Sequence, residues 1–192
     1  MTLSNCKNEE RLALFSQEGE PIEGSVLRTE AHEKGILHGA SHTYIGKKEK
    51  GEICLLLQRR SEFKDSFAGC LDTSSAGHVE FGYNHIETAM KELEEELGIR
   101  VAAEELIELF TQEIYQVSEF YGKPFIDHEI NRVYLLARDV DPKSLRFQPS
   151  EVSGAVWMKA ADILRLLEEK DGSVCIAEKE FKQVLAEMEK YI

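Results

Sequence analysis

The sequence predicts an α/β fold in which a mixed β-sheet packs between helices. Apolar segments typical of strands alternate along the chain with amphipathic segments typical of helices, and no repeat or low-complexity linker separates them. The chain has 192 residues, of which 42% are hydrophobic, enough for one substantial core but not for two full domains. We therefore expect one domain over residues 36–192, preceded by an N-terminal hairpin extension over residues 1–35.

The expected strands are rich in Ile, Leu, Val and Tyr and are bounded by charged or glycine-containing turns; they cover residues 11–15, 25–28, 41–45, 52–58, 109–117 and 132–137. The first two flank the turn segment QEGEPIEG, which predicts a hairpin at the entrance to the domain. Helices are expected over residues 86–97, 160–169 and 177–191, where apolar residues recur with helical spacing.

Composition disfavours several classes of function. The formal net charge of -13 disfavours a nucleic-acid partner, because binding to a phosphate backbone relies on Lys and Arg side chains. The N-terminal segment has no apolar signal core, and no apolar run approaches the length of a membrane span. The cysteines contain no C-x-x-C pair, which argues against a zinc knuckle or a disulfide framework: Cys6, Cys54, Cys70 and Cys175. We expect a cytoplasmic protein that binds neither nucleic acid nor a membrane.

Three glutamates, Glu92, Glu95 and Glu96, lie within about one helical turn of the segment from Gly77 to Ile99. Glu92 faces the other two, and like charges so placed cost a few tenths of a kcal/mol per pair. An apolar stripe runs beside them, so the carboxylates flank a buried face: Ile86, Ala89, Met90, Leu93 and Leu97. Because hard divalent cations bind carboxylate oxygens, the cluster predicts a metal site. A solvated acidic face is the alternative for such a helix taken alone.

The same segment resembles the Nudix box, G-x5-E-x7-R-E-U-x-E-E-x-G-U, in which U is aliphatic. The residues that fit are Gly77, Glu92, Leu93, Glu95, Glu96, Gly98 and Ile99. Two positions depart from the pattern, with Tyr83 in place of the first Glu and Lys91 in place of Arg. The likeness extends over residues 55–99 and is strongest to the branch that includes isopentenyl-diphosphate isomerase. It implies a Nudix-type α/β/α sandwich with a mixed β-sheet, in which the strand around Trp157 closes the sheet.

Basic side chains follow the apolar strand at residues 53–57: Arg59, Arg60 and Lys64. Positive groups there could clamp a diphosphate, and Arg offers two-pronged geometry to phosphate. Solvated charges at a strand end are the alternative. The isomerase-like branch carries basic residues at these positions, which favours phosphate binding, and Lys91 joins this expected substrate-binding set.

Histidines form a further group. The segment AHEKGILHGASH resembles the isomerase segment that supplies two metal-binding histidines, which here are His32 and His38, although the gap between them is one residue shorter. His78 fits a third ligand. Asp127 and Glu129, in FIDHEINRVYLL, fall where that branch has two carboxylate ligands. The resemblance therefore implies a second metal-ligating set, whereas a histidine taken alone is usually structural.

The resemblance implies a Mg²⁺- or Mn²⁺-dependent pyrophosphohydrolase acting on a small diphosphate linked to another group, for example a nucleoside diphosphate derivative. Gly77, Glu95 and Glu96 hold the metal, Glu92 holds metal or orients the attacking water, and Glu129 assists as base. A non-catalytic Nudix-fold binder stays open, because it would explain Tyr83 and Lys91. An isomerase is disfavoured, because Ala76 stands where that branch has its catalytic cysteine. A homodimer also stays open.

Overall fold

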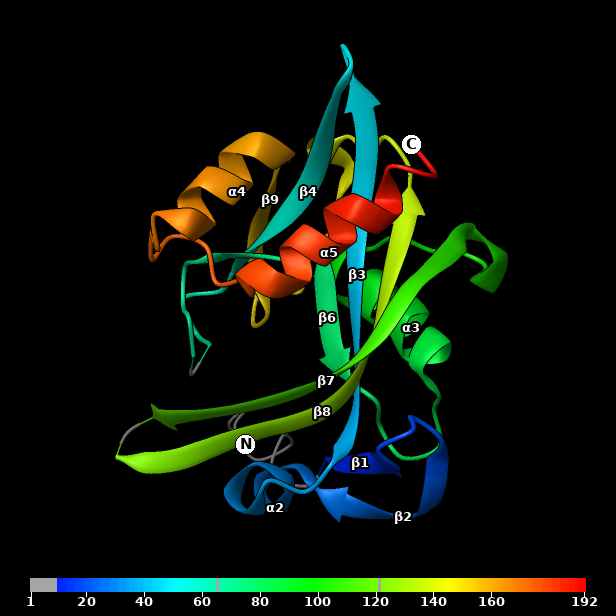
Figure 1. The fold of residues 1–192 in the computed structure, drawn as a ribbon, viewed down its shortest axis with the longest axis vertical. Helices are drawn as coiled ribbons and strands as arrows, with labels where there is room; N and C mark the ends of the chain where they lie inside the picture. Colours follow the sequence, from blue (N-terminus) through cyan, green and yellow to red (C-terminus); the bar gives the residue numbers. More distant parts are fainter. Residues whose placement is uncertain (1–9, 65, 121) are drawn as a thin grey trace.

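The computed structural model describes residues 10–64, 66–120 and 122–192. Within them, nine strands form one mixed sheet: β1 (Arg11–Phe15), β2 (Pro21–Leu27), β3 (His38–Glu49), β4 (Glu52–Arg60), β5 (Leu71–Asp72), β6 (Ser75–His78), β7 (Leu106–Phe120), β8 (Lys123–Ala137) and β9 (Val152–Lys159) (Figure 1). The α-helices of the same residues are α2 (Arg28–Lys34), α3 (His85–Leu97), α4 (Ala160–Glu168) and α5 (Glu178–Met188). No described helix has the length and hydropathy that crossing a membrane requires.

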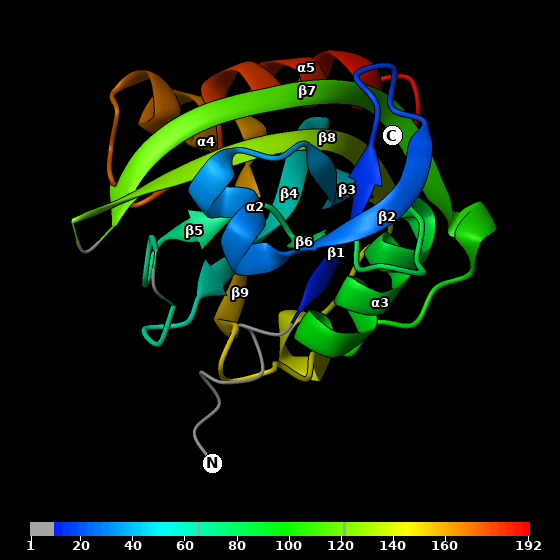
Figure 2. The ribbon, with the colours of Figure 1, turned by 90° about the horizontal axis from the view of Figure 1, so that it is seen from below.

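Strand β3 is the centre of the sheet. It pairs in antiparallel fashion with β4 and β6 and in parallel with β8, which makes the sheet mixed as expected. Successive side chains of a strand point to opposite faces. Tyr44 therefore packs with α4 and α5 in one apolar cluster, while Ile45 packs with α3 in another. Figure 2 shows the sheet between α3 on one side and α4 and α5 on the other, so the three-layer α/β/α arrangement is confirmed.

The expected N-terminal hairpin is present as β1 and β2, and it joins the sheet where Leu14 pairs with His38 of β3. The division of the chain between residues 35 and 36 stays a prediction. Residues 1–9, which include Cys6, lie outside the described residues, and the other cysteines are free: Cys54, Cys70 and Cys175.

Two parts of the fold differ from what the sequence pattern indicates. Helix α2 has only seven residues and no side-chain cap at Leu27, so it leaves almost no helical pattern, although it ends at Gly35 with the left-handed φ of 64° typical of a helix C-cap. The strands expected over residues 109–117 and 132–137 are both longer in the structure. Strand β7 runs to Phe120 and β8 starts at Lys123, because the two polar strands continue to pair with each other outward from the core.

Candidate active site

A cavity of about 550 Å³ brings most of the expected site residues together. Its wall carries more carboxylates than Lys and Arg side chains. The carboxylates are Glu10, Asp72, Glu80, Glu92, Glu95, Glu96, Asp127, Glu129, Glu151 and Glu180, and the Lys and Arg side chains are Arg28, Arg60, Lys64 and Lys91. A surface of this charge attracts cations and repels a bare diphosphate.

The box glutamates, defined as Glu92, Glu95 and Glu96, are held by a helix with well-formed ends. Asn84 caps α3 at its N-terminus in a capping box with Glu87, and Gly98 ends it with φ 71°. Gly77 on β6 lies against this helix. A Cβ added at Gly77 would sit 2.5 Å from Cδ of Glu92, so only glycine lets that carboxylate approach the strand.

The buried environment changes the protonation of two box glutamates. Glu96 is 4% exposed and accepts hydrogen bonds from the Ser75 hydroxyl at 2.7 Å and the Ala76 backbone N–H at 3.3 Å. Burial and the neighbouring Glu92 charge raise the pKa of Glu96 to about 8. Burial also raises the pKa of Glu92 to about 7, although the Lys91 charge opposes this. Both carboxyls hold protons near neutral pH that a cation could displace.

Lys91 lies among carboxylates. Its Nζ is 3.0 Å from Oε1 of Glu80, 3.4 Å from Oε1 of Glu92 and 3.1 Å from Oε2 of Glu95. Burial opposes the charged ammonium, but these carboxylates outweigh it and raise the pKa of Lys91 above its usual range. Lys91 was expected to contact substrate. Without substrate its ammonium is engaged with the cavity's own carboxylates, whose charge it offsets, and the contact with substrate stays a prediction.

The histidine cluster, defined as His32, His38, His78 and Glu129, is assembled from four elements. His32 comes from α2, His38 opens β3, His78 ends β6 and Glu129 lies on β8. Sheet register brings the last three together, because His38 pairs with Glu129 and the next cavity-facing residue of β3, Ala40, pairs with His78. The four ligand atoms lie within 4.8 Å of one another. Among the described residues no other group of side chains meets this condition, and the box glutamates do not.

The histidine cluster fits a metal ion. Nδ1 of His32 lies 2.8 Å from the Arg28 carbonyl and Nδ1 of His38 lies 2.8 Å from the Ile36 carbonyl, so each ring donates there and turns the lone pair of Nε2 inward. Nε2 of His38 is buried and has no hydrogen-bond partner among the residues that the structure describes. Nε2 of His78 lies 3.2 Å from Nε2 of His32 and 3.1 Å from Oε1 of Glu129. A cation bound between these atoms would remove the repulsion among their converging lone pairs.

Burial lowers the pKa of His78 to about 3, which keeps this one ring neutral. Asp127 was expected to join these ligands. It lines the cavity with Oδ1 3.3 Å from Nε2 of His32, beside the cluster but outside the converging set. The ring of Phe125 stacks on His32 with centroids 4.3 Å apart, which fixes the imidazole plane.

Of the basic residues expected after the strand at residues 53–57, two reach the cavity. Arg60 is paired with Asp72 at 2.9 Å, and Lys64 is paired with Glu151. Arg59, the third residue of this expected set, does not line the cavity. Its side chain is exposed outside the cavity wall and donates to the Gly69 carbonyl at 2.9 Å, because neighbouring residues of a strand point to opposite faces.

Comparison with known proteins places this geometry in a family. The NUDIX domain model matches residues 38–178. The chain belongs to the Nudix family. It is 35% identical over 162 residues to an uncharacterized Nudix hydrolase of Clostridium acetobutylicum, covering 84% of this chain and 76% of that protein. It is 35% identical over 167 residues to Nudix hydrolase 3 of Arabidopsis thaliana, covering 85% of this chain but 21% of that protein.

The isomerase likeness is also present. The isopentenyl-diphosphate Delta-isomerase of Serratia proteamaculans is 30% identical over 166 residues, covering 84% of this chain and 81% of that protein. Solved structures show the Nudix fold. The Deinococcus radiodurans protein DR0079 has a TM-score of 0.65 at 22% identity, covering 91% and 98% of the two chains. The NUDIX domain of Shewanella oneidensis NrtR, solved with ADP ribose, has a TM-score of 0.54 at 15% identity, covering 78% and 86%.

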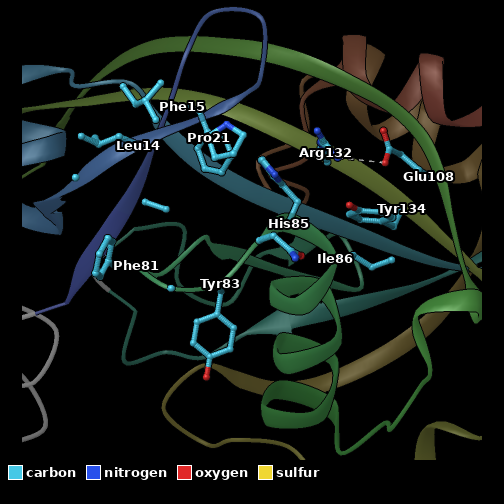
Figure 3. A pocket seen from close by; sticks show the side chains of 15 residues that line it. Leu14, Phe15, Pro21, Phe81, Tyr83, His85, Ile86, Glu108, Arg132 and Tyr134 are labelled. Carbon is cyan, nitrogen blue, oxygen red and sulfur yellow. Dashed lines mark ion pairs between the residues drawn. The ribbon is translucent and has the colours of Figure 1, made fainter.

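The two departures from the Nudix box have different structural consequences. Tyr83 lies outside the acidic cavity, at a second hollow of about 480 Å³ between the N-terminal hairpin and α3, where Figure 3 shows it with Phe81. Glu80, three residues earlier, reaches Lys91 instead. Sequence reasoning missed Glu80, since it lies at a position that the Nudix pattern leaves unspecified. The Nudix box therefore keeps a carboxylate partner for Lys91 despite Tyr83.

Proposed function

We propose that this Nudix protein is a divalent-metal-dependent pyrophosphohydrolase that cleaves a small diphosphate linked to another group, such as a nucleoside diphosphate derivative. The observation that carries the proposal is that one cavity is lined by the box glutamates, by Arg60 and Lys64, and by His78 and Glu129, which are two members of the histidine cluster. The hydrolase names of two curated relatives support it. The ADP ribose bound by the Shewanella NUDIX domain supports the substrate class.

The proposed roles follow from position and protonation. The histidine cluster would hold one divalent ion, with Asp127 at its edge, and a nitrogen-rich set suits Mn²⁺ or another transition metal better than Mg²⁺. The Gly77 carbonyl, Glu95 and Glu96 would hold Mg²⁺ or Mn²⁺ through oxygen. A bound ion supplies charge neutralisation at the phosphate oxygens and a more acidic water.

Glu92 is the best-placed general base. It lines the cavity, and its pKa of about 7 suits a group that accepts a proton at neutral pH. Glu129, the base that the family resemblance implies, is 7% exposed and lies 3.1 Å from His78, so its oxygen is engaged in the histidine cluster. Arg60 and Lys64 would bind the phosphate that does not react, each held in place by its carboxylate partner.

Isomerase activity is the second candidate, because curated relatives about 30% identical to this chain are isopentenyl-diphosphate isomerases. Ala76 on β6 opposes it, since a methyl group can neither donate nor accept a proton. A non-catalytic binder is the third candidate and would use the same cavity.

One assay separates the three. Protein stripped of metal is incubated with dinucleotides, nucleoside triphosphates and isopentenyl diphosphate, with and without Mg²⁺ or Mn²⁺. Hydrolysis that requires the ion supports the proposal. Formation of dimethylallyl diphosphate above a no-enzyme control supports the isomerase, and binding without any turnover supports the binder.

A further inference from the structure

A buried carboxylate on α5 collects hydrogen bonds from three strands. Glu180 is 3% exposed and accepts from the Tyr44 hydroxyl at 2.7 Å, from Gln112 Nε2 at 2.6 Å and from Asn131 Nδ2 at 3.3 Å. His42 Nδ1 lies 2.9 Å from the same carboxylate. A buried carboxylate with this many donors stays ionised, and an ionised buried group requires a charged partner. Burial opposes this ionisation, but His42 and the other donors outweigh it and lower the pKa of Glu180.

His42 is the charged partner. Burial disfavours its protonated ring, but the adjacent Glu180 charge outweighs burial and raises the pKa of His42 to about 9. The other charges that act on it are carboxylates too, Asp72 from β5 and Glu129 from β8. A protonated imidazole donates through both nitrogens. With Nδ1 committed to Glu180, Nε2–H lies on the other side of the ring.

The imidazole of His42 is accessible from the acidic cavity. His42 lines the cavity, and 22% of its side chain is exposed. Directly across the β3–β6 pair stands Ala76, whose methyl group leaves the imidazole uncovered. The cavity's Arg and Lys side chains are each within 4.0 Å of a carboxylate: Arg28, Arg60, Lys64 and Lys91. The Nε2 atom of His42 has no such partner among the described residues.

We propose that His42 is a phosphate-binding residue of this cavity, seated on Glu180 so that its Nε2–H donates to an oxygen of the bound diphosphate. The inference rests on the proposed function only in taking the cavity as the diphosphate site. It assigns Glu180 as a positioning residue, which acts through His42 and does not touch the substrate. The His42–Glu180 pair thus adds a positively charged hydrogen-bond donor to a cavity lined mostly by carboxylates. The proposed metal ligands do not supply such a donor.

The test measures binding of methylenediphosphonate, which cannot be hydrolysed at its P–C–P bridge, by calorimetry in the presence of Mn²⁺. We expect His42→Gln to weaken binding by about tenfold or more, as loss of a charged hydrogen bond does. Glu180→Gln should weaken binding to a similar extent. So should the double variant that combines His42→Gln with Glu180→Gln, in which neither buried charge of the pair remains. Lys48→Gln removes one exposed positive charge from the same strand, and Glu178→Gln removes one exposed negative charge from the same helix. Both controls should bind within about twofold of the wild type.

A second readout separates a direct contact from a structural effect. In ¹⁵N-histidine spectra, the resonance that disappears in His42→Gln should shift when methylenediphosphonate is added to the wild type. Unaltered binding by both His42→Gln and the double variant overturns the inference, as does a wild type that fails to bind. If the wild type hydrolyses diphosphates while His42→Gln binds normally, the function stands and this inference fails. If binding depends on His42 but no diphosphate is hydrolysed, this inference stands and the hydrolase function fails.

Discussion

Two clusters of ligand side chains meet at the cavity, which His78 and Glu129 of the histidine cluster line together with the box glutamates, and the two clusters differ in how they could accept a cation. In the histidine cluster, backbone carbonyls fix the rings of His32 and His38, and Nε2 of His38 is buried without a hydrogen bond to any described residue, 3.7 Å from Oε1 of Glu129. The negative charge of the box glutamates is offset by the Lys91 ammonium and by the proton that Glu96 retains. The first cluster is already shaped as a metal site, whereas the second must lose protons and share Lys91 before it can bind an ion.

This difference predicts an order of binding. The histidine cluster should bind a transition metal in the free protein, because its ligand atoms already lie within 4.8 Å of one another. The box glutamates should bind a second ion more weakly, because the ion must displace protons and compete with the Lys91 ammonium. A diphosphate supplies additional oxygen ligands and should strengthen that second site.

The largest expected effect concerns the first site. His38→Ala should lower the affinity of the metal-free protein for Mn²⁺ by roughly 100-fold or more, since even outer partners of metal-bound histidines contribute 10–100-fold. Glu95→Gln, in the second site and 49% exposed, should change the affinity for the first ion by less than about threefold. Calorimetric titration with Mn²⁺ measures both. Equal losses in the two variants would mean that the clusters form one site.

The next effect concerns catalysis. Glu96→Gln should lower kcat by roughly 100-fold or more while the protein stays folded, because the carboxylate charge that would hold an ion is lost. Glu94→Gln is the matched control. Glu94 lies on the same helix but pairs with Arg100 at 2.7 Å, away from the cavity. The kcat of Glu94→Gln should therefore stay within about twofold of the wild-type value. Full activity of Glu96→Gln would remove the box glutamates from the reaction.

Protonation of Glu96 predicts the pH dependence of stability. Its folded-state pKa of about 8 lies above the ordinary 4.5, so between these values the folded metal-free protein binds more protons than the unfolded chain. Its contribution to stability therefore falls as pH rises from about 5 to about 8. Glu96→Gln should lose less stability over this window, with a difference of roughly 3 to 4 kcal/mol in the free energy of unfolding. Urea denaturation at pH 5 and pH 8 measures it, and parallel pH profiles of the two proteins would contradict it.

The smallest effect concerns Lys91. Arg can hold Glu92 and Glu95 with a planar fork, whereas a Lys ammonium holds charge without that geometry. We expect Lys91→Arg to raise kcat by up to about tenfold through better positioning of these carboxylates. Steady-state kinetics at saturating metal measure the change. If kcat falls while the circular dichroism spectrum is unchanged, Lys91 contacts the substrate directly.

The parts of the site that sequence predicted are those with strong local patterns. Helix α3 carries an apolar stripe, the Asn84 cap and the Gly98 stop, and its glutamates follow from spacing alone. The histidine cluster was predicted only through the family resemblance, because His32 and Glu129 are far apart in the chain. Helix α2 has seven residues and no side-chain cap, so the local sequence does not indicate that it places His32 beside β8.

Long-range pairs and strand faces were beyond local prediction. His42 and Glu180 lie 138 positions apart, and only the packing of α5 over β3 brings them into contact. Arg59 and Arg60 look equivalent in sequence, yet strand alternation sends Arg60 to the cavity and Arg59 to the exposed surface. Glu80 belongs to the candidate site because it contacts Lys91. No spacing rule in the sequence indicates this contact.

The most direct test of metal-dependent diphosphate cleavage follows phosphomonoester release from ADP ribose, a dinucleotide polyphosphate and isopentenyl diphosphate. Wild type, His38→Ala and Glu96→Gln are each measured after metal removal and again with added Mn²⁺. We expect the wild type to cleave at least one compound only when Mn²⁺ is present, and both variants to be at least about 100-fold slower. Cleavage in excess EDTA, wild-type rates in both variants, or tight binding of a diphosphate without cleavage of any would contradict the hydrolase.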